Sequence, residues 1–96
     1  MADYRLSQKA KGDLAKITKY TIANFGRSQA AHYRAQLESF LVRLAESPHI
    51  GHSADQAYEG LRVFPHQGQM IYYLITPSGP FIVRILHHSM DAKRHL

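Results

Sequence analysis

The sequence predicts an α+β fold. A short strand at residues 4–6 leads into an antiparallel helical hairpin, which packs on one face of a mainly antiparallel β-sheet, and a short tail ends the chain. The main observation is that apolar residues recur every three or four positions before Pro48 and form strand-like runs after it. The 96 residues are 45% hydrophobic, which suffices for one core and not two, so residues 1–96 are expected to form one domain.

Two helices are predicted between residues 7 and 47. Ser7 is placed to cap the first helix and Gly26 to end it, while Ser28 is placed to cap the second, which Ser47 and Pro48 stop. A tight turn between them makes the helices antiparallel. The apolar residues expected to face the core are Ala10, Leu14, Ile17 and Phe25 in the first helix, and Ala30, Tyr33, Leu37, Phe40, Leu41 and Leu44 in the second.

Three strands are predicted after a polar loop at residues 49–59, at residues 61–64, 69–76 and 81–87. The Pro- and Gly-containing turns at 65–68 and 77–80 are spaced for hairpins, so the strands should form an antiparallel meander. Apolar residues occupy both parities of the last two strands, which is typical of strands covered on both faces. One face would receive the helices. The other would need a partner, and some of Tyr72, Leu74, Ile82 and Leu86 are expected to line it.

Charge and composition narrow the class of partner. Twelve Lys and Arg against seven Asp and Glu give a net charge of +5, which favours an acidic partner such as nucleic acid, a ribosome or an acidic protein segment. The N-terminus has no hydrophobic signal core, and the longest apolar run, residues 70–75, is far below the roughly 20 residues that span a bilayer. A cytoplasmic protein without membrane contact is expected.

Seven histidines raise the question of a metal site. His49 and His52 are three positions apart, His87 and His88 are adjacent, and none forms the helical pair of zinc peptidases. The chain has no cysteine and contains no phosphate-binding loop or dinucleotide fingerprint. No metal and no cofactor are therefore expected.

Several short phrases occur in an order and spacing that resemble the RelE/ParE superfamily of type II toxins, and most of all its ParE branch. The resemblance covers nearly the whole chain and implies a RelE/ParE-like fold with a curved sheet. The phrases are Leu6-Ser7 with Ala10 and Asp13-Leu14, Leu44 to Pro48 with Gly51, Gly60-Leu61-Arg62, and Val83 to His87 with Met90-Asp91.

The resemblance implies that the protein is the toxin of a type II toxin–antitoxin system. The ParE branch poisons DNA gyrase by stabilising its DNA-cleaved state, which requires no catalytic residue on the toxin. The contact is expected mainly in the last strand and the tail, where cations and small apolar anchors cluster. The residues expected to bind this target are Arg62, Arg84, His87, His88, Met90, Asp91, Lys93 and Arg94.

The second implied partner is an acidic, ParD-like antitoxin that folds on docking and forms a hetero-oligomer with the toxin. A helix and a strand of the antitoxin are expected to cover the helical hairpin and the open sheet face. DNA would be contacted only through gyrase or the antitoxin. The residues expected to bind the antitoxin are Lys9, Lys16, Lys19, Tyr72, Leu74, Ile82 and Leu86.

Two alternatives remain open from the residues. An mRNA endonuclease of RelE type needs a base, an acid and several cations, but Gln69 and Met70 stand where that branch has an arginine. The remaining candidates are Arg62, Arg84, Lys93, Arg94, His66, His87, His88 and His95. For Arg84 a structural role is favoured, bonded to carbonyls or to a carboxylate such as Asp91. The other alternative, a non-toxic interaction or DNA-binding module, lacks a helix face rich in cations and amides.

Overall fold

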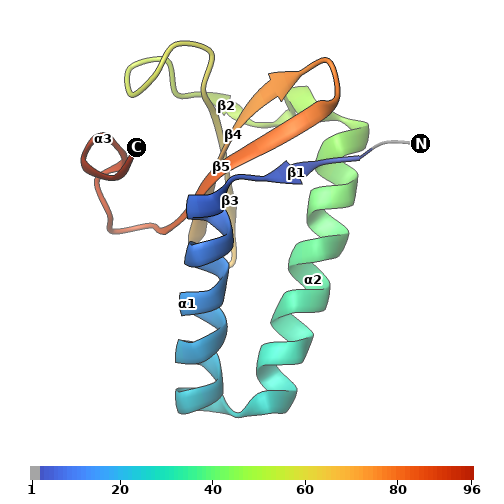
Figure 1. The fold of residues 1–96 in the computed structure, drawn as a ribbon, viewed down its shortest axis with the longest axis vertical. Coiled ribbons are helices and arrows are strands. Elements are labelled where there is room, and N and C mark those ends of the chain that lie inside the picture. The colour runs from blue at the N-terminus through green and yellow to red at the C-terminus, as the bar shows by residue number, and fades with distance from the viewer. Residues whose placement is uncertain (1–2) are drawn as a thin grey trace.

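The computed structural model describes residues 3–96, and its element order agrees with the predicted fold class (Figure 1). Two long helices follow a short first strand, and three longer strands and a C-terminal tail come after them. The elements are β1 (Arg5–Leu6), α1 (Gln8–Phe25), α2 (Arg27–Glu46), the 3-10 helix η1 (Pro48–Ile50), β2 (His52–Ser53), β3 (Arg62–His66), β4 (Gln69–Thr76), β5 (Gly79–His87) and α3 (Ala92–His95). No helix within residues 3–96 is long and apolar enough to cross a membrane.

The five strands form one mixed sheet with the order β1-β5-β4-β3-β2. Strand β1 pairs in parallel with β5, and all other pairs are antiparallel, so the predicted meander of β3, β4 and β5 is confirmed. The segment predicted as a loop at residues 49–59 contains η1 and the short strand β2, which pairs with the start of β3. The loop prediction was wrong there, because a two-residue strand is too short to leave a periodic signal.

The hairpin turns are tighter than predicted. Only Gln67 and Gly68 connect β3 to β4, with φ of 48° and 83°, so Pro65 and His66 belong to the strand and not to the turn. Two consecutive residues with positive φ form the turn whose twist matches that of paired strands. In the same way Gly79, with a φ of 107°, begins β5 directly after the turn.

Ser7 joins the first helix to the sheet. Its hydroxyl accepts a hydrogen bond from the Ala10 N–H at 2.9 Å, as expected of a cap, and donates one to the Val83 carbonyl of β5 at 2.6 Å. The second predicted cap was wrong. Helix α2 begins at Arg27 and Gly26 occupies the cap position with a φ of 91°, which reverses the chain without a side-chain cap, so Ser28 lies inside the helix.

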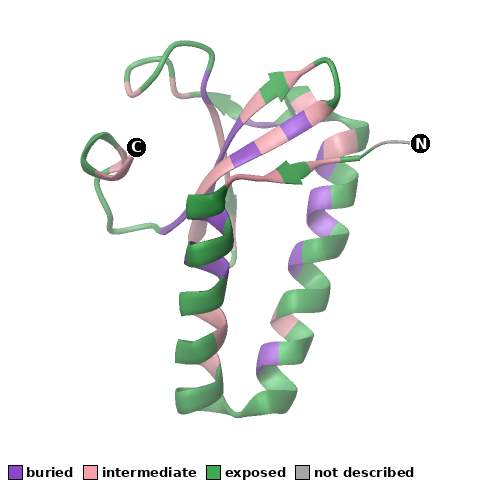
Figure 2. Cartoon of the chain, viewed as in Figure 1, coloured by how far each residue is buried: buried purple, intermediate pink, exposed green. Residues whose placement is uncertain are grey.

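The main core lies between the helical hairpin and one face of the sheet. Leu37, Ile71, Tyr73 and Ile82 have no exposed surface and pack together with most of the predicted helix positions. On α1 the buried residues are confined to the part next to the sheet, as Figure 2 shows. The distal end of the hairpin extends beyond the sheet. Phe25 is therefore 65% exposed, and its predicted place in the core was wrong.

The opposite face of the sheet is covered by the chain itself. Leu61, Tyr72 and Leu86 form a second buried cluster there. Ala54 and Ala57 of the loop before β3, together with Ala92 and Leu96 of the tail, pack against this cluster. The prediction that this face lies open for a partner was wrong for Tyr72 and Leu86, because the loop and the tail remove them from solvent.

A β-bulge explains why Ile82 lies on the other side from the one predicted. Tyr72 pairs with Arg84 but Tyr73 pairs with Ile82, so Val83 is an extra residue in β5. One extra residue shifts the alternation of side chains by one position. Ile82 and Ile85 consequently both face the helices, whereas strict alternation places Ile82 and Leu86 on one face.

Candidate functional site

A groove of ≈ 850 Å³ separates the distal part of the helical hairpin from the end of the sheet and the tail. Its helical wall is formed by residues of α1 and α2, and its opposite wall by β5 and by residues that follow it. The helical wall includes Lys16, Ile17, Tyr20, Thr21, Phe25, Gln29 and Tyr33, and the opposite wall includes Arg84, Ile85, Leu86, His87, Met90 and His95.

Large apolar side chains of the groove are exposed to solvent. Tyr20 is 63% exposed and Phe25 is 65% exposed on the helical wall, while Met90 on the tail is 45% exposed. Tyr20 and Phe25 are exposed because α1 extends past the sheet, so no strand lies beneath its distal end. Exposed apolar groups gathered in a concave surface are typical of a protein-binding site.

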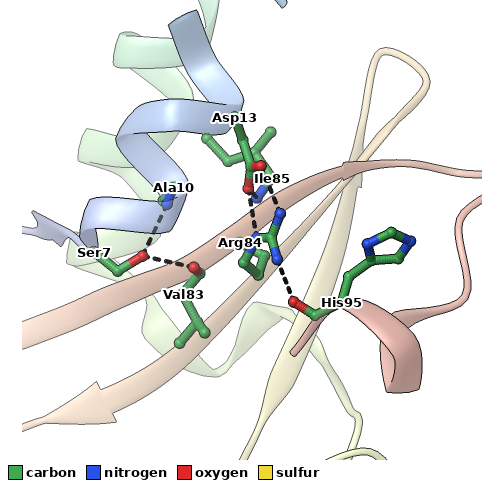
Figure 3. Close-up of polar contacts among 7 residues, drawn as sticks. All are labelled: Ser7, Ala10, Asp13, Val83, Arg84, Ile85 and His95. Carbon is green, nitrogen blue, oxygen red and sulfur yellow. Dashed lines mark hydrogen bonds and ion pairs between the residues drawn. The ribbon is translucent and has the colours of Figure 1, made fainter. Parts of the chain in front are cut away.

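An ion pair fixes the base of the groove (Figure 3). Asp13 of α1 accepts hydrogen bonds from Nε and Nη2 of Arg84, both at 2.8 Å, and from the Ile85 N–H at 2.9 Å. The side chains are only 14% and 9% exposed for Arg84 and Asp13. The hydrogen bond with Asp13 raises the pKa of Arg84, so the guanidinium is charged at every relevant pH.

Arg84 also holds the C-terminal tail. Its Nη1 donates to the carbonyl oxygen of His95, and Figure 3 shows the guanidinium lying between helix α1 and the tail. The structural role predicted for Arg84 is in agreement with these contacts, but its carboxylate partner is Asp13. Asp91 instead caps the tail helix α3, where its carboxylate accepts from the Lys93 N–H at 3.0 Å. The predicted pairing with Asp91 was wrong.

Arg62 of β3 is also engaged within the protein. Its Nη2 donates to the carbonyl oxygens of His49 at 2.9 Å and Gly51 at 2.5 Å. Arg62 and Arg84 are therefore both bound to protein acceptors, and neither projects a free guanidinium toward the groove. Stabilising a developing phosphate charge requires cations aimed at that position.

The histidines do not form one cluster. His66 lies on the far side of α2, with its ring centroid 5.0 Å from that of Phe40. Burial, with a smaller effect of Arg43, lowers the pKa of His66, so its ring is neutral at pH 7. The rings of His87 and His88 are tilted against each other with centroids 4.2 Å apart, and the His87 Nδ1 shares a hydrogen bond of 2.7 Å with the Ser89 hydroxyl. Nowhere from residue 3 to residue 96 do three His, Asp or Glu side chains gather as metal ligands.

Comparison with known proteins shows the family. The model described as "ParE toxin of type II toxin-antitoxin system, parDE" matches residues 4–92. The chain belongs to the ParE toxin family. Toxin ParE1 of Caulobacter vibrioides is 34% identical over 96 residues, with 100% of this chain and 99% of the relative covered. Toxin ParE of Escherichia coli is 30% identical over 97 residues, with 100% and 94% covered.

A solved structure shows the same fold. A chain of the "Chromosomal ParDE TA system from P. aeruginosa" superposes with a TM-score of 0.76. The match covers 91% of this chain and 96% of the solved chain, at 17% sequence identity. The two chains therefore have the same fold although few of their residues are identical.

The residues predicted to bind gyrase or an antitoxin are distributed over several places in this ParE-family chain. Arg84, His87, Met90, Lys16 and Leu86 line the groove. Six others are exposed but do not line the groove: Lys9 and Lys19 on α1, and His88, Asp91, Lys93 and Arg94 on the tail. Tyr72 and Leu74 belong to the second core cluster, Ile82 lies in the main core, and Arg62 is half-buried beside η1.

Sequence analysis missed the aromatic residues of the helical wall. Tyr20 was not assigned a role, and Phe25 was assigned to the core. A signal was present, because the large apolar residues of α1 continue beyond Leu14 and Ile17 to Tyr20, Ile22 and Phe25. Where an apolar stripe continues past the sheet that it covers, its last members stay exposed, and exposed apolar residues that gather together are typical of a binding surface.

Proposed function

We propose that this toxin of a type II toxin–antitoxin system stops growth by binding DNA gyrase and stabilising its DNA-cleaved state. The observation that carries the proposal is the engagement of Arg62 and Arg84 by acceptors within the protein. An endonuclease needs such cations for the phosphate, whereas a poison that acts by binding needs none. It only has to fit the cleaved complex better than the resealed one.

The tail supplies a surface suited to a target that contains DNA. Lys93 and Arg94 are exposed, and neither forms an ion pair with any residue from 3 to 96. They follow the exposed Met90 closely in the sequence, and His87, His88 and His95 lie in the same segment. Unpaired cations around an apolar anchor favour contact with a polyanionic complex. DNA itself would be reached only through gyrase or the antitoxin.

We further propose that an acidic ParD-like antitoxin forms a hetero-oligomer with this toxin and neutralises it. The net charge of +5 supports an acidic partner, and the exposed apolar residues support one that buries them on docking. Toxin and antitoxin would meet in the cytoplasm, where gyrase acts on its DNA.

A growth experiment tests the proposal. The toxin is expressed from a tightly controlled promoter with and without its antitoxin, and a DNA-damage reporter and the 5′ ends of transcripts are followed over time. We expect growth arrest with early induction of the reporter, intact transcripts, and rescue by the antitoxin. New transcript ends that appear before any DNA damage would identify the toxin as an endonuclease of RelE type and overturn the proposal.

A further inference from the structure

We propose that a second groove, between helix α2 and the turn from β3 to β4, binds a phosphate group. This polar groove has a volume of ≈ 390 Å³, and Gln67 is the residue that it shares with the larger groove. One wall is a single face of α2, and the other is formed by His66 and Gln67. The proposal concerns binding alone, with no bond made or broken, and it does not depend on the proposed function.

The helical wall of the polar groove carries hydrogen-bond donors at regular intervals. His32, Gln36, Ser39 and Arg43 follow one another at spacings of three or four positions, so they lie on the same face of α2. Arg43 is exposed and forms no ion pair with any residue that the structure describes. Its guanidinium is therefore available to a ligand, and a guanidinium can bind a phosphate through two parallel hydrogen bonds.

The charge of the polar groove is of one sign. Among the residues described by the structure, its lining contains no carboxylate. On α2, Glu38 pairs with Arg34 at 3.9 Å on another face of the helix, and Glu46 lies outside the lining. A concave surface lined by one sign of charge concentrates the electric field and attracts the opposite charge. The polar groove therefore favours an anion, and its several donors suit the oxygens of a phosphate.

His66 contributes a ring nitrogen that has no partner. Its ring centroid lies 5.0 Å from that of Phe40, and its Nδ1 is buried without a hydrogen bond to any residue between 3 and 96. Buried polar atoms of this kind are usually hydrogen-bonded, so this one indicates a place where a polar ligand would be stabilised. The ring also lines the polar groove, and the broad torsion of a histidine ring lets a nitrogen turn toward a ligand there.

The two walls of the polar groove are already held together. The Gln67 Nε2 donates to the Gln36 Oε1 at 2.5 Å, and the positive φ values of Gln67 and Gly68 fix the turn that carries this contact. Gln36 uses only its carbonyl oxygen in that bond, so its amide nitrogen is still available as a donor. A site whose walls are fixed in advance loses little conformational entropy on binding. Its volume of ≈ 390 Å³ lies within the range of small-ligand sites, about 300–1,000 Å³.

The first test measures anion binding to the purified protein by NMR. Sulfate is the probe, because it has the shape of phosphate but does not change its charge near neutral pH, and chloride at equal ionic strength is the reference. Arg43→Gln should weaken sulfate binding by roughly tenfold. Arg27→Gln is the matched control, because it removes the same charge from an exposed arginine of α2 outside the polar groove, and it should bind like wild type.

The second test follows the titration of the His66 ring in wild-type protein and needs no variant. Burial and the charge of Arg43 lower the pKa of His66, whereas a dianion bound between the two side chains would favour the protonated ring. The pKa of His66 should therefore be higher in sulfate than in chloride. Two other titratable groups are close: His32 lines the same groove and gives its own NMR signal, and Tyr33 stays neutral because burial raises its pKa.

A third comparison identifies the source of the phosphate. Short single-stranded DNA that binds roughly tenfold tighter than inorganic phosphate, at the same residues, would identify a nucleic-acid backbone. Equal or tighter binding of inorganic phosphate would identify a small phosphate compound, and either result supports the site. The proposal is overturned if sulfate does not bind, if Arg43→Gln and Arg27→Gln weaken binding equally, or if saturating sulfate leaves the pKa of His66 unchanged. None of these results depends on whether the toxin binds gyrase.

Discussion

Replacing Asp13 with alanine is expected to lower the free energy of unfolding by about 3–5 kcal/mol. The reason is that the substitution leaves the Arg84 guanidinium without a counter-charge in a site where its side chain is only 14% exposed. It also leaves the Ile85 N–H without its acceptor. Urea unfolding followed by circular dichroism measures the loss.

A double substitution distinguishes the effect of losing the ion pair on stability from the effect of losing packing. Asp13→Leu combined with Arg84→Met removes both charges and keeps most of the apolar volume, so we expect it to recover most of the stability lost in Asp13→Ala. Such a recovery would show that the stability lost in Asp13→Ala comes from the unpaired Arg84 charge. A decrease below 1 kcal/mol for Asp13→Ala would show that the pair does not hold α1 to β5.

Replacing Gly51 with alanine is expected to lower the free energy of unfolding by about 3 kcal/mol. A Cβ at this position would overlap the Tyr73 hydroxyl and lie 2.9 Å from its Cε1. Tyr73 is fully buried, and its hydroxyl donates to the Pro48 carbonyl at 2.7 Å and accepts from the Gly51 N–H at 3.0 Å. The ring therefore has to move and lose both hydrogen bonds, which a shift of the urea midpoint would report.

The partner substitution Tyr73→Phe provides the control. It removes the hydroxyl that the new Cβ would overlap, so Gly51→Ala should cost less in the Tyr73→Phe background than in wild type. We expect the double variant to be more stable than the sum of the two single losses predicts. Additive losses would place the effect of Gly51→Ala elsewhere, in the backbone of the η1–β2 connection.

Periodicity was enough to predict the two long helices and the three long strands. Leu37, Phe40, Leu41 and Leu44 recur at helical spacing and are all buried, as the pattern of α2 indicates. Sequence analysis could not place the bulge at Val83, because one extra residue leaves the composition of β5 unchanged. That single residue decides which sheet face Ile82 occupies, so the predicted place of Ile82 on the open face was wrong.

The ion pair of the site could be predicted only in part. Arg84 is a lone arginine in a predominantly apolar strand, which favoured a structural role, but its partner lies 71 positions earlier in the chain. A usable signal was Asp13 itself, a lone carboxylate beside Ala10 and Leu14 on the face of α1 that packs on the sheet. A buried acid in one element and a lone arginine in another are expected to pair, because neither can be buried alone.

The groove could not be predicted, because it depends on where α1 crosses the sheet and where the tail returns. Periodicity describes which face of a helix is apolar and says nothing of how far the sheet extends beneath it. Tyr20 and Phe25 become a wall of the groove only because the hairpin extends past the strands. Met90 becomes its counterpart only because Arg84 holds the tail beside β5.

The most direct test of whether this toxin acts by binding measures DNA cleavage by purified gyrase. Supercoiled plasmid, gyrase and ATP are incubated with increasing toxin, and the DNA is then treated with detergent and protease and separated by electrophoresis. We predict that linear DNA accumulates with toxin concentration and that prior addition of antitoxin prevents it. Unchanged plasmid, together with cleavage of messenger RNA by the same preparation, would show that this chain breaks bonds itself and does not act by binding.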